Sequence, residues 1–241
     1  MLLTVERFSM KVGGAAVVGV LHLPPSGPAP CVVACHGMGS SKDSDKYELL
    51  GGAFPEAGLA LARFDFRGSG ESDGLYRDAT IASRIADLEA VLDHLAGHPC
   101  LDGRFGLLGS SLGGFVALWV ASGRRPAMPV VTWNAPAGLG ALAASRCADV
   151  TSPGAALVAD VRAGRYVEAP AGASHVLVVQ GDADDVVAPG HGRMLFERAV
   201  EPRALCLLPG ADHRLSDPLH RFEAVERSRD WLARYLHAEP A

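Results

Sequence analysis

Residues 104–114 read RFGLLGSSLGG and place two adjacent serines, Ser110 and Ser111, between glycines. An apolar run precedes the serines and a second apolar segment follows them, so the stretch predicts a buried strand that turns sharply into a helix. Such a turn needs small residues on both sides, because the backbone is strained and the helix lies close to the strand. Gly109 and Gly113 meet this need and put Ser111 at the centre of a G-x-S-x-G pattern. Ser111 is therefore the candidate nucleophile, and Ser110 is its neighbour.

Further apolar runs alternate with helical patterns along the whole chain. The first two runs, at 3–10 and 15–24, are so close that they predict an antiparallel hairpin. Six more short strands are expected, at 30–37, 59–66, 104–110, 129–136, 175–182 and 203–210. Helices are expected at 80–97, 112–121, 190–200 and 219–236. The alternation predicts an α/β fold in a single domain over residues 1–241, with an eight-stranded, mostly parallel sheet flanked by helices.

The segment 137–173 does not fit this alternation. It is rich in Ala and Gly and too long for a plain connection. Segments of this kind in compact domains tend to be functional lids. We expect a short helical cap over the carboxyl edge of the sheet. The alternative is an extra pair of surface helices without a role in substrate contact.

A serine is a poor nucleophile by itself and needs a base that is oriented by an acid. Both must lie at strand ends on the same edge of the sheet. His213 is the only histidine just past the last predicted strand, and it is the candidate base. Asp184, three residues past the glycine that closes the preceding strand, is preferred as the acid, while Asp185 and Asp182 in the same loop remain alternatives. The chain order Ser, Asp, His is the one that sheet enzymes of this kind use.

Two backbone N–H groups are needed to stabilise negative charge on a bound carbonyl oxygen. One is the N–H of Leu112, which follows Ser111 at the positive end of the predicted helix. The second is expected from Met38, because the glycines around it let the backbone turn an amide inward. His36 in the same loop and Trp133 late in a strand are candidate pocket residues, although a Trp in that position is as often part of a core.

Composition narrows the class of partner. A net charge of -5 and a pI near 6.0 give no basic footprint for nucleic acid or anionic lipid, so a small, roughly neutral partner is favoured and neither a nucleic-acid nor a membrane partner is expected. Together with the candidate serine, histidine and aspartate, this favours a small-molecule ester substrate. The N-terminal apolar run is broken at Glu6, which predicts a cytoplasmic protein. The nine histidines show no zinc-type spacing, so no metal is expected. A homodimer is compatible with the sequence, which does not fix the oligomeric state.

Five stretches in this order resemble the α/β-hydrolase superfamily over almost the whole chain. They are HGMGSSK (36–42), RFDFRGSGESDG (63–74), GSSLGG (109–114), QGDADDVVAP (180–189) and PGADHRLSD (209–217). Within the superfamily they look most like small bacterial serine esterases of the cinnamoyl and feruloyl esterase type, related to serine aminopeptidase-like hydrolases. The resemblance implies that Ser111 is the nucleophile, His213 the general base and Asp184 its partner, with Met38 and Leu112 as oxyanion donors and no cofactor.

The cap expected here is shorter than that of cinnamoyl esterase-type enzymes, which does not favour a bulky phenolic substrate. The leading prediction is a serine hydrolase that cleaves carboxylic esters of small or medium acyl groups through an acyl-enzyme. Thioesterase or aminopeptidase-like amidase activity remains an alternative, because all three reactions share a tetrahedral intermediate. An alternative of another class is a non-catalytic, ligand-binding α/β-hydrolase homologue.

Overall fold

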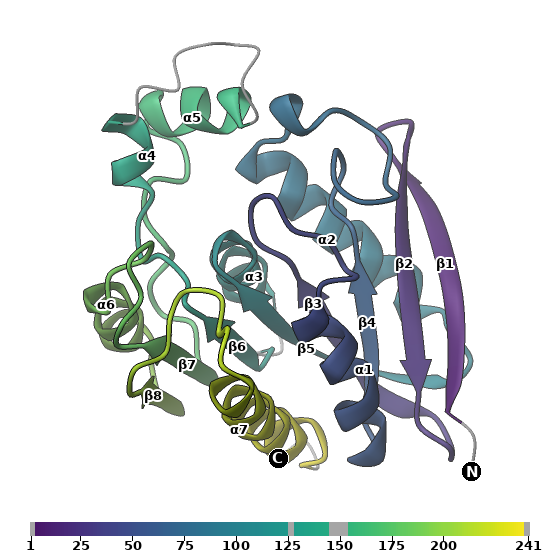
Figure 1. Cartoon of the computed structure of the whole chain (residues 1–241). Helices are drawn as coiled ribbons and strands as arrows, with labels where there is room; N and C mark the ends of the chain where they lie inside the picture. The colour runs from purple at the N-terminus through teal and green to yellow at the C-terminus, as the bar shows by residue number, and fades with distance from the viewer. Residues whose placement is uncertain (1–2, 125–127, 145–153, 239–241) are drawn as a thin grey trace.

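A computed structural model describes residues 3–124, 128–144 and 154–238 of the 241-residue chain. Its centre is one eight-stranded sheet in the order β1-β2-β4-β3-β5-β6-β7-β8 (Figure 1). The strands are β1 (Thr4–Val12), β2 (Ala15–Leu23), β3 (Ala29–Cys35), β4 (Ala60–Phe64), β5 (Leu101–Ser110), β6 (Val130–Trp133), β7 (Val176–Gly181) and β8 (Arg203–Leu208). Strand β2 runs antiparallel to β1 and β4, and all other neighbours are parallel. The predicted mostly parallel α/β sheet with an N-terminal hairpin is confirmed.

Helices cover both faces of the sheet (Figure 1). One face carries α2 (Ile81–Ala96), α3 (Leu112–Gly123) and α6 (Gly190–Arg198), and the other carries α1 (Asp45–Glu56) and α7 (Pro218–Leu236). Because parallel strands all end at the same edge, the loops that follow β3, β5, β7 and β8 converge there. This edge is where the sequence motifs meet.

Helix α1 was not expected from the sequence. Gly51, Gly52 and Pro55 lie within it, and glycine and proline are the poorest helix formers. The helix forms because Tyr47, Leu50 and Phe54 on one of its sides are fully buried against the sheet. Tertiary packing thus outweighs local propensity here.

The predicted cap segment contains two short helices, α4 (Gly140–Ala144) and α5 (Ala155–Arg162), which lie at the top of the molecule in Figure 1. Residues 145–153 of this segment lie outside the described residues. Two backbone hydrogen bonds join the ends of the segment: Leu139 N–H donates to Val167 O at 2.7 Å, and Ala169 N–H donates to Ala137 O at 2.9 Å. α5 packs against the 3-10 helix η1 (Tyr76–Asp78).

Within the described ranges, no helix combines the length and the apolar character that crossing a membrane requires.

Candidate active site

The turn between β5 and α3 holds Ser111 in an unusual backbone conformation, with φ 53° and ψ −126°. A non-glycine residue in such a conformation stores about 1–3 kcal/mol of strain. The neighbouring glycines have no room for a side chain: a Cβ on Gly109 would lie 2.4 Å from Gly113 C, and one on Gly113 would lie 2.1 Å from Cys35 O. Helix α3 therefore packs directly on the strands, and Ser111 is held at its first turn.

His213 lies between Ser111 and Asp184. Its Nε2 is 3.2 Å from Ser111 Oγ, and its Nδ1 is 2.8 Å from Asp184 Oδ2. An ionised carboxylate can only accept hydrogen bonds, so Nδ1 carries the ring proton and Nε2 is left as an acceptor facing the serine hydroxyl. This tautomer can remove a proton from Ser111 Oγ.

Asp184 is 5% exposed, and its two oxygens have separate partners. Oδ1 accepts hydrogen bonds from Val186 N–H at 2.9 Å and from Val187 N–H at 2.7 Å, while Oδ2 faces His213. The side chain of Gln180 also donates to Oδ2, at 3.3 Å. These bonds fix the direction of the carboxylate, so that Oδ2 points at the histidine.

The other two aspartates of this loop do not contact His213. Asp185 is exposed, and Asp182 accepts a hydrogen bond from Gly210 N–H at 2.6 Å. Asp182 thereby ties the loop after β7 to the loop after β8. Of the three alternatives, the structure brings only Asp184 together with the histidine.

Asn134 joins the loops that bear the histidine and the aspartate. It follows β6 with φ 49°, and its Nδ2 donates to Asp212 O at 3.1 Å and to His213 O at 3.0 Å. Its Oδ1 accepts from Gly181 N–H at 2.8 Å. Sequence reasoning gave this residue no role, although an Asn directly after a strand is a residue type that tolerates positive φ.

Met38 and Leu112 both line the same cavity as Ser111. Within the described part of the chain, neither backbone N–H has a hydrogen-bond partner. The loop of Met38 approaches the serine closely, since a Cβ on Gly37 would lie 3.0 Å from Ser111 Cβ. The two amides are therefore available to an oxygen bound next to Ser111.

The expectation that His36 and Trp133 line the pocket is wrong. Both side chains are buried, and neither lines the cavity. His36 donates from Nδ1 to Gly37 O at 2.8 Å and accepts at Nε2 from Phe66 N–H at 3.1 Å. Burial lowers the His36 pKa to about 4, so the ring is neutral and supports the loop of Met38. Trp133 packs in the core beneath α7.

The cavity over Ser111 has a volume of about 710 Å³ and two chemically different walls. The apolar wall comes mainly from the cap segment and the loop after β7. It comprises Pro136, Leu139, Leu142, Val186 and Val187. The polar wall comes from the start of α1, the loop between β8 and α7, and the start of α7. It comprises Ser44, Asp45, Lys46, Arg214, Ser216 and Arg221.

Lys46 is a site residue that the sequence analysis missed. Its Nζ donates to Ser110 Oγ at 2.7 Å, next to the candidate nucleophile. Burial, with the positive charges of Arg221 and Arg214, lowers the Lys46 pKa to about 8. Only its place on the unexpected helix α1 brings it to the site, so no local signal pointed to it.

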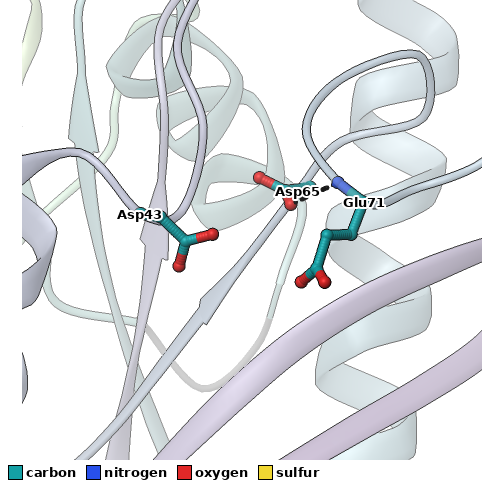
Figure 2. Close-up of side chains that lie close together, drawn as sticks. All are labelled: Asp43, Asp65 and Glu71. Atoms are coloured by element: carbon teal, nitrogen blue, oxygen red, sulfur yellow. Dashed lines mark hydrogen bonds between the residues drawn. The ribbon is translucent and has the colours of Figure 1, made fainter.

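A cluster of three carboxylates lies outside the cavity lining. Oxygens of Asp43, Asp65 and Glu71 lie within 4.8 Å of one another (Figure 2), and Glu71 N–H donates to Asp65 Oδ2 at 2.9 Å. The ammonium of Lys42 is bonded to all three carboxylates, at 2.6, 3.2 and 2.6 Å. The position between these carboxylates is thus taken by a lysine side chain, and the cluster fits a structural ion-pair network.

Comparisons with known proteins show the family and the fold of this chain. A family model for serine aminopeptidase, S33, matches residues 26–158. An uncharacterized protein of Mycobacterium tuberculosis is 30% identical over 200 residues, which are 80% of this chain and 65% of that protein. The chain thus spans about 65% of the length of this relative.

Two further proteins similar to this chain have an activity or a bound ligand in their names. The mitochondrial palmitoyl-protein thioesterase ABHD10 of Homo sapiens is 32% identical over 98 residues, 41% of this chain and 30% of that protein. The structure of Est1E from Butyrivibrio proteoclasticus with ferulic acid bound superposes with a TM-score of 0.82 at 18% identity, covering 96% of this chain and 100% of that chain. From the matched family model and the shared fold, the chain belongs to the serine aminopeptidase (S33) family of α/β hydrolases.

Proposed function

We propose that this protein is a serine hydrolase that cleaves carboxylic esters of small or medium acyl groups through an acyl-enzyme. The observation that carries the proposal is the continuous hydrogen-bonded array of Ser111, His213 and Asp184 beside a cavity. Nucleophile, base and orienting acid in this arrangement are the parts that acyl transfer needs.

The reaction follows from the positions of the protons. His213 Nε2 removes the hydroxyl proton as Ser111 Oγ attacks the ester carbonyl, and Asp184 stabilises the imidazolium that forms. The N–H groups of Met38 and Leu112 donate to the oxyanion of the tetrahedral intermediate. The imidazolium returns its proton to the leaving alcohol. Water, activated by the same histidine, then hydrolyses the acyl-enzyme and releases the acid.

The cavity supports an acyl group of limited size. Its apolar wall offers aliphatic contacts next to Ser111, and its volume of about 710 Å³ also has to hold the leaving group. The structural neighbour Est1E has ferulic acid bound, a carboxylic acid of the kind that ester hydrolysis releases. We therefore place esters first.

Thioester hydrolysis by the same residues is the second candidate, because a relative is named a palmitoyl-protein thioesterase. Amide hydrolysis is the third, because the family is described as serine aminopeptidase. Release of a free thiol from acyl thioesters, or of an amine from aminoacyl amides, would identify these activities. If the protein only binds a ligand without catalysis, it should hydrolyse none of the esters, thioesters or amides.

The test is hydrolysis of p-nitrophenyl esters from acetate to decanoate by the wild type, Ser111→Ala and Ser110→Ala. We expect activity to peak at short or medium chains and to fall to background in Ser111→Ala. Ser110→Ala is the matched control. It loses one hydrogen bond to Lys46, so we expect its activity to stay within about tenfold of the wild type. Equal activity of Ser111→Ala and the wild type, or no hydrolysis of any ester by the wild type, would contradict the proposal.

A further inference from the structure

The polar wall of the cavity carries more positive than negative charge. Lys46, Arg214 and Arg221 line the cavity, while Asp45 is the one acidic residue in its lining. The Asp45 side chain is 87% exposed, and its nearest approach to Arg221 is 3.8 Å, so it neutralises the wall only in part. Three cations and one exposed anion leave a net positive surface facing the space beside Ser111.

Two of the three cations have unused hydrogen-bond donors. An ammonium has three N–H donors, and among the described residues Lys46 Nζ has a single acceptor, Ser110 Oγ. Arg214 is exposed, and within the described part of the chain its guanidinium has no hydrogen bond or ion pair. Arg221 differs, since it donates to Leu215 O and Ser216 O and so supports the loop that follows His213.

The position of Lys46 has a cost that the protein alone does not offset. Bringing an ammonium out of water near two guanidinium groups disfavours its charged form, and its pKa is correspondingly lowered. A buried or half-buried charge is normally paired. The carboxylate cluster of Asp43, Asp65 and Glu71 is bonded to Lys42 and not to Lys46. The missing counter-charge is therefore one that a ligand can supply.

Resting on the proposed function, we propose that this wall binds an anionic group of the substrate, so that the preferred esters carry a carboxylate or a phosphate a few bonds from the scissile carbonyl. The apolar wall of the same cavity contacts the uncharged part of the substrate. Lys46 and Arg214 are then specificity-determining residues. Their effect is to favour anionic over neutral esters.

The first experiment compares two matched esters of equal chain length, p-nitrophenyl hemiglutarate and p-nitrophenyl pentanoate. A charge-assisted hydrogen bond contributes enough to raise kcat/KM about tenfold, so we expect the wild type to favour the hemiglutarate by about that factor or more. Lys46→Met and Arg214→Gln should each lower this ratio several-fold. Lys11→Met and Arg77→Gln, which remove exposed charges outside the cavity lining, are matched controls and should leave the ratio unchanged.

A second pair places the charge on the leaving group: 4-acetoxybenzoate and its methyl ester. A preference for the anion in this pair alone would place the polar wall on the leaving-group side. A preference for the anion in the first pair alone would place the polar wall on the acyl side. Competitive inhibition by glutarate or by inorganic phosphate distinguishes the two anion types. If both ester pairs are hydrolysed without preference for the anion, or if neither variant changes the ratio, the inference is wrong while the proposed function stands.

If the folded wild type hydrolyses none of these esters, the proposed function fails, and binding then tests the inference separately. Isothermal titration calorimetry would use glutarate and phosphate with Ser111→Ala and with Ser111→Ala/Lys46→Met. Binding that weakens about tenfold in the double variant supports the anion site. No binding to Ser111→Ala, or equal binding to both proteins, overturns it.

Discussion

Replacing Asp184 with Asn changes one heavy atom of the side chain whose hydrogen bond to His213 sets the tautomer of that ring. The Asn oxygen can still accept the N–H bonds of Val186 and Val187, so the loop retains its support. The amide nitrogen takes the place of Oδ2, 2.8 Å from His213 Nδ1. Because that nitrogen only donates, Nδ1 must become the acceptor and the ring proton moves to Nε2.

This tautomer cannot accept a proton from Ser111, so the chemical step should slow greatly. The same exchange in a serine protease triad lowers kcat about 10⁴-fold, which corresponds to about 5.5 kcal/mol of transition-state stabilisation. The carboxylate of Asp184 also stabilises the imidazolium, and that contribution is lost together with the tautomer. We therefore expect kcat of Asp184→Asn to fall by about 10⁴, with a small change in KM.

The assay is hydrolysis of p-nitrophenyl acetate, with thermal unfolding measured on the same preparations. Asp185→Asn is the matched control, because it removes the same charge from an exposed position one residue away. Its activity should stay within about twofold of the wild type and its stability within about 0.5 kcal/mol. The reasoning is refuted if folded Asp184→Asn keeps more than about a tenth of wild-type kcat, or if Asp185→Asn loses as much.

Three further predictions concern groups around the site. Asn134→Gly keeps a positive φ accessible but removes three hydrogen bonds, so kcat should fall at least about tenfold. An unchanged kcat would show that Asn134 does not position His213. Lys42→Met leaves the buried carboxylate of Asp65 without its ammonium partner, while Asp43 keeps Arg63 and Glu71 keeps Arg7, and it should cost about 3–5 kcal/mol of stability. Ca²⁺ should raise the Tm of this variant but hardly that of the wild type; equal shifts would contradict the assignment of the cluster as an ion-pair network. The Lys46 pKa is about 8, so its ammonium is charged at pH 7 and loses its proton as the pH rises through 8. The kcat/KM preference for the anionic ester should therefore decline between about pH 7 and 9. A constant ratio would exclude Lys46 as a group that binds the anion.

The elements that could be predicted from the sequence are those with a local physical cause. Gly109 and Gly113 are required where α3 packs on the strands, so the pattern around Ser111 located the turn and the candidate nucleophile together. The mostly parallel pairing of the sheet followed from the alternation of apolar runs and helical patterns, whereas the order of the strands was not predicted. Helix α1 could not be found in this way, because Gly51, Gly52 and Pro55 give it poor local propensity.

The direction of side chains at the ends of strands is the second feature that the sequence did not predict. His36 and Trp133 both lie at strand ends near the site, yet both point into the protein interior. The choice among three neighbouring aspartates likewise depends on turn geometry, in which the N–H groups of the loop aim the carboxylate of Asp184. Asn134 contributes through contacts with residues far away in the sequence, which a local pattern does not contain.

Other expectations from the sequence stay predictions. These are the absence of a metal and of a cofactor, the lack of nucleic-acid and membrane partners, the homodimer and the cytoplasmic location. The lysine-filled carboxylate cluster bears on the first of them, since Lys42 already supplies the positive charge. The remaining ones need measurements on the protein itself.

The most direct test of the central claim is covalent labelling with a fluorophosphonate, followed by mass mapping of the modified peptide. A fluorophosphonate reacts with a serine that is activated by a neighbouring base. The account predicts one adduct on Ser111 in the wild type and in Ser110→Ala, and no adduct in Ser111→Ala. An unlabelled wild type, or an adduct carried by Ser110, would contradict it.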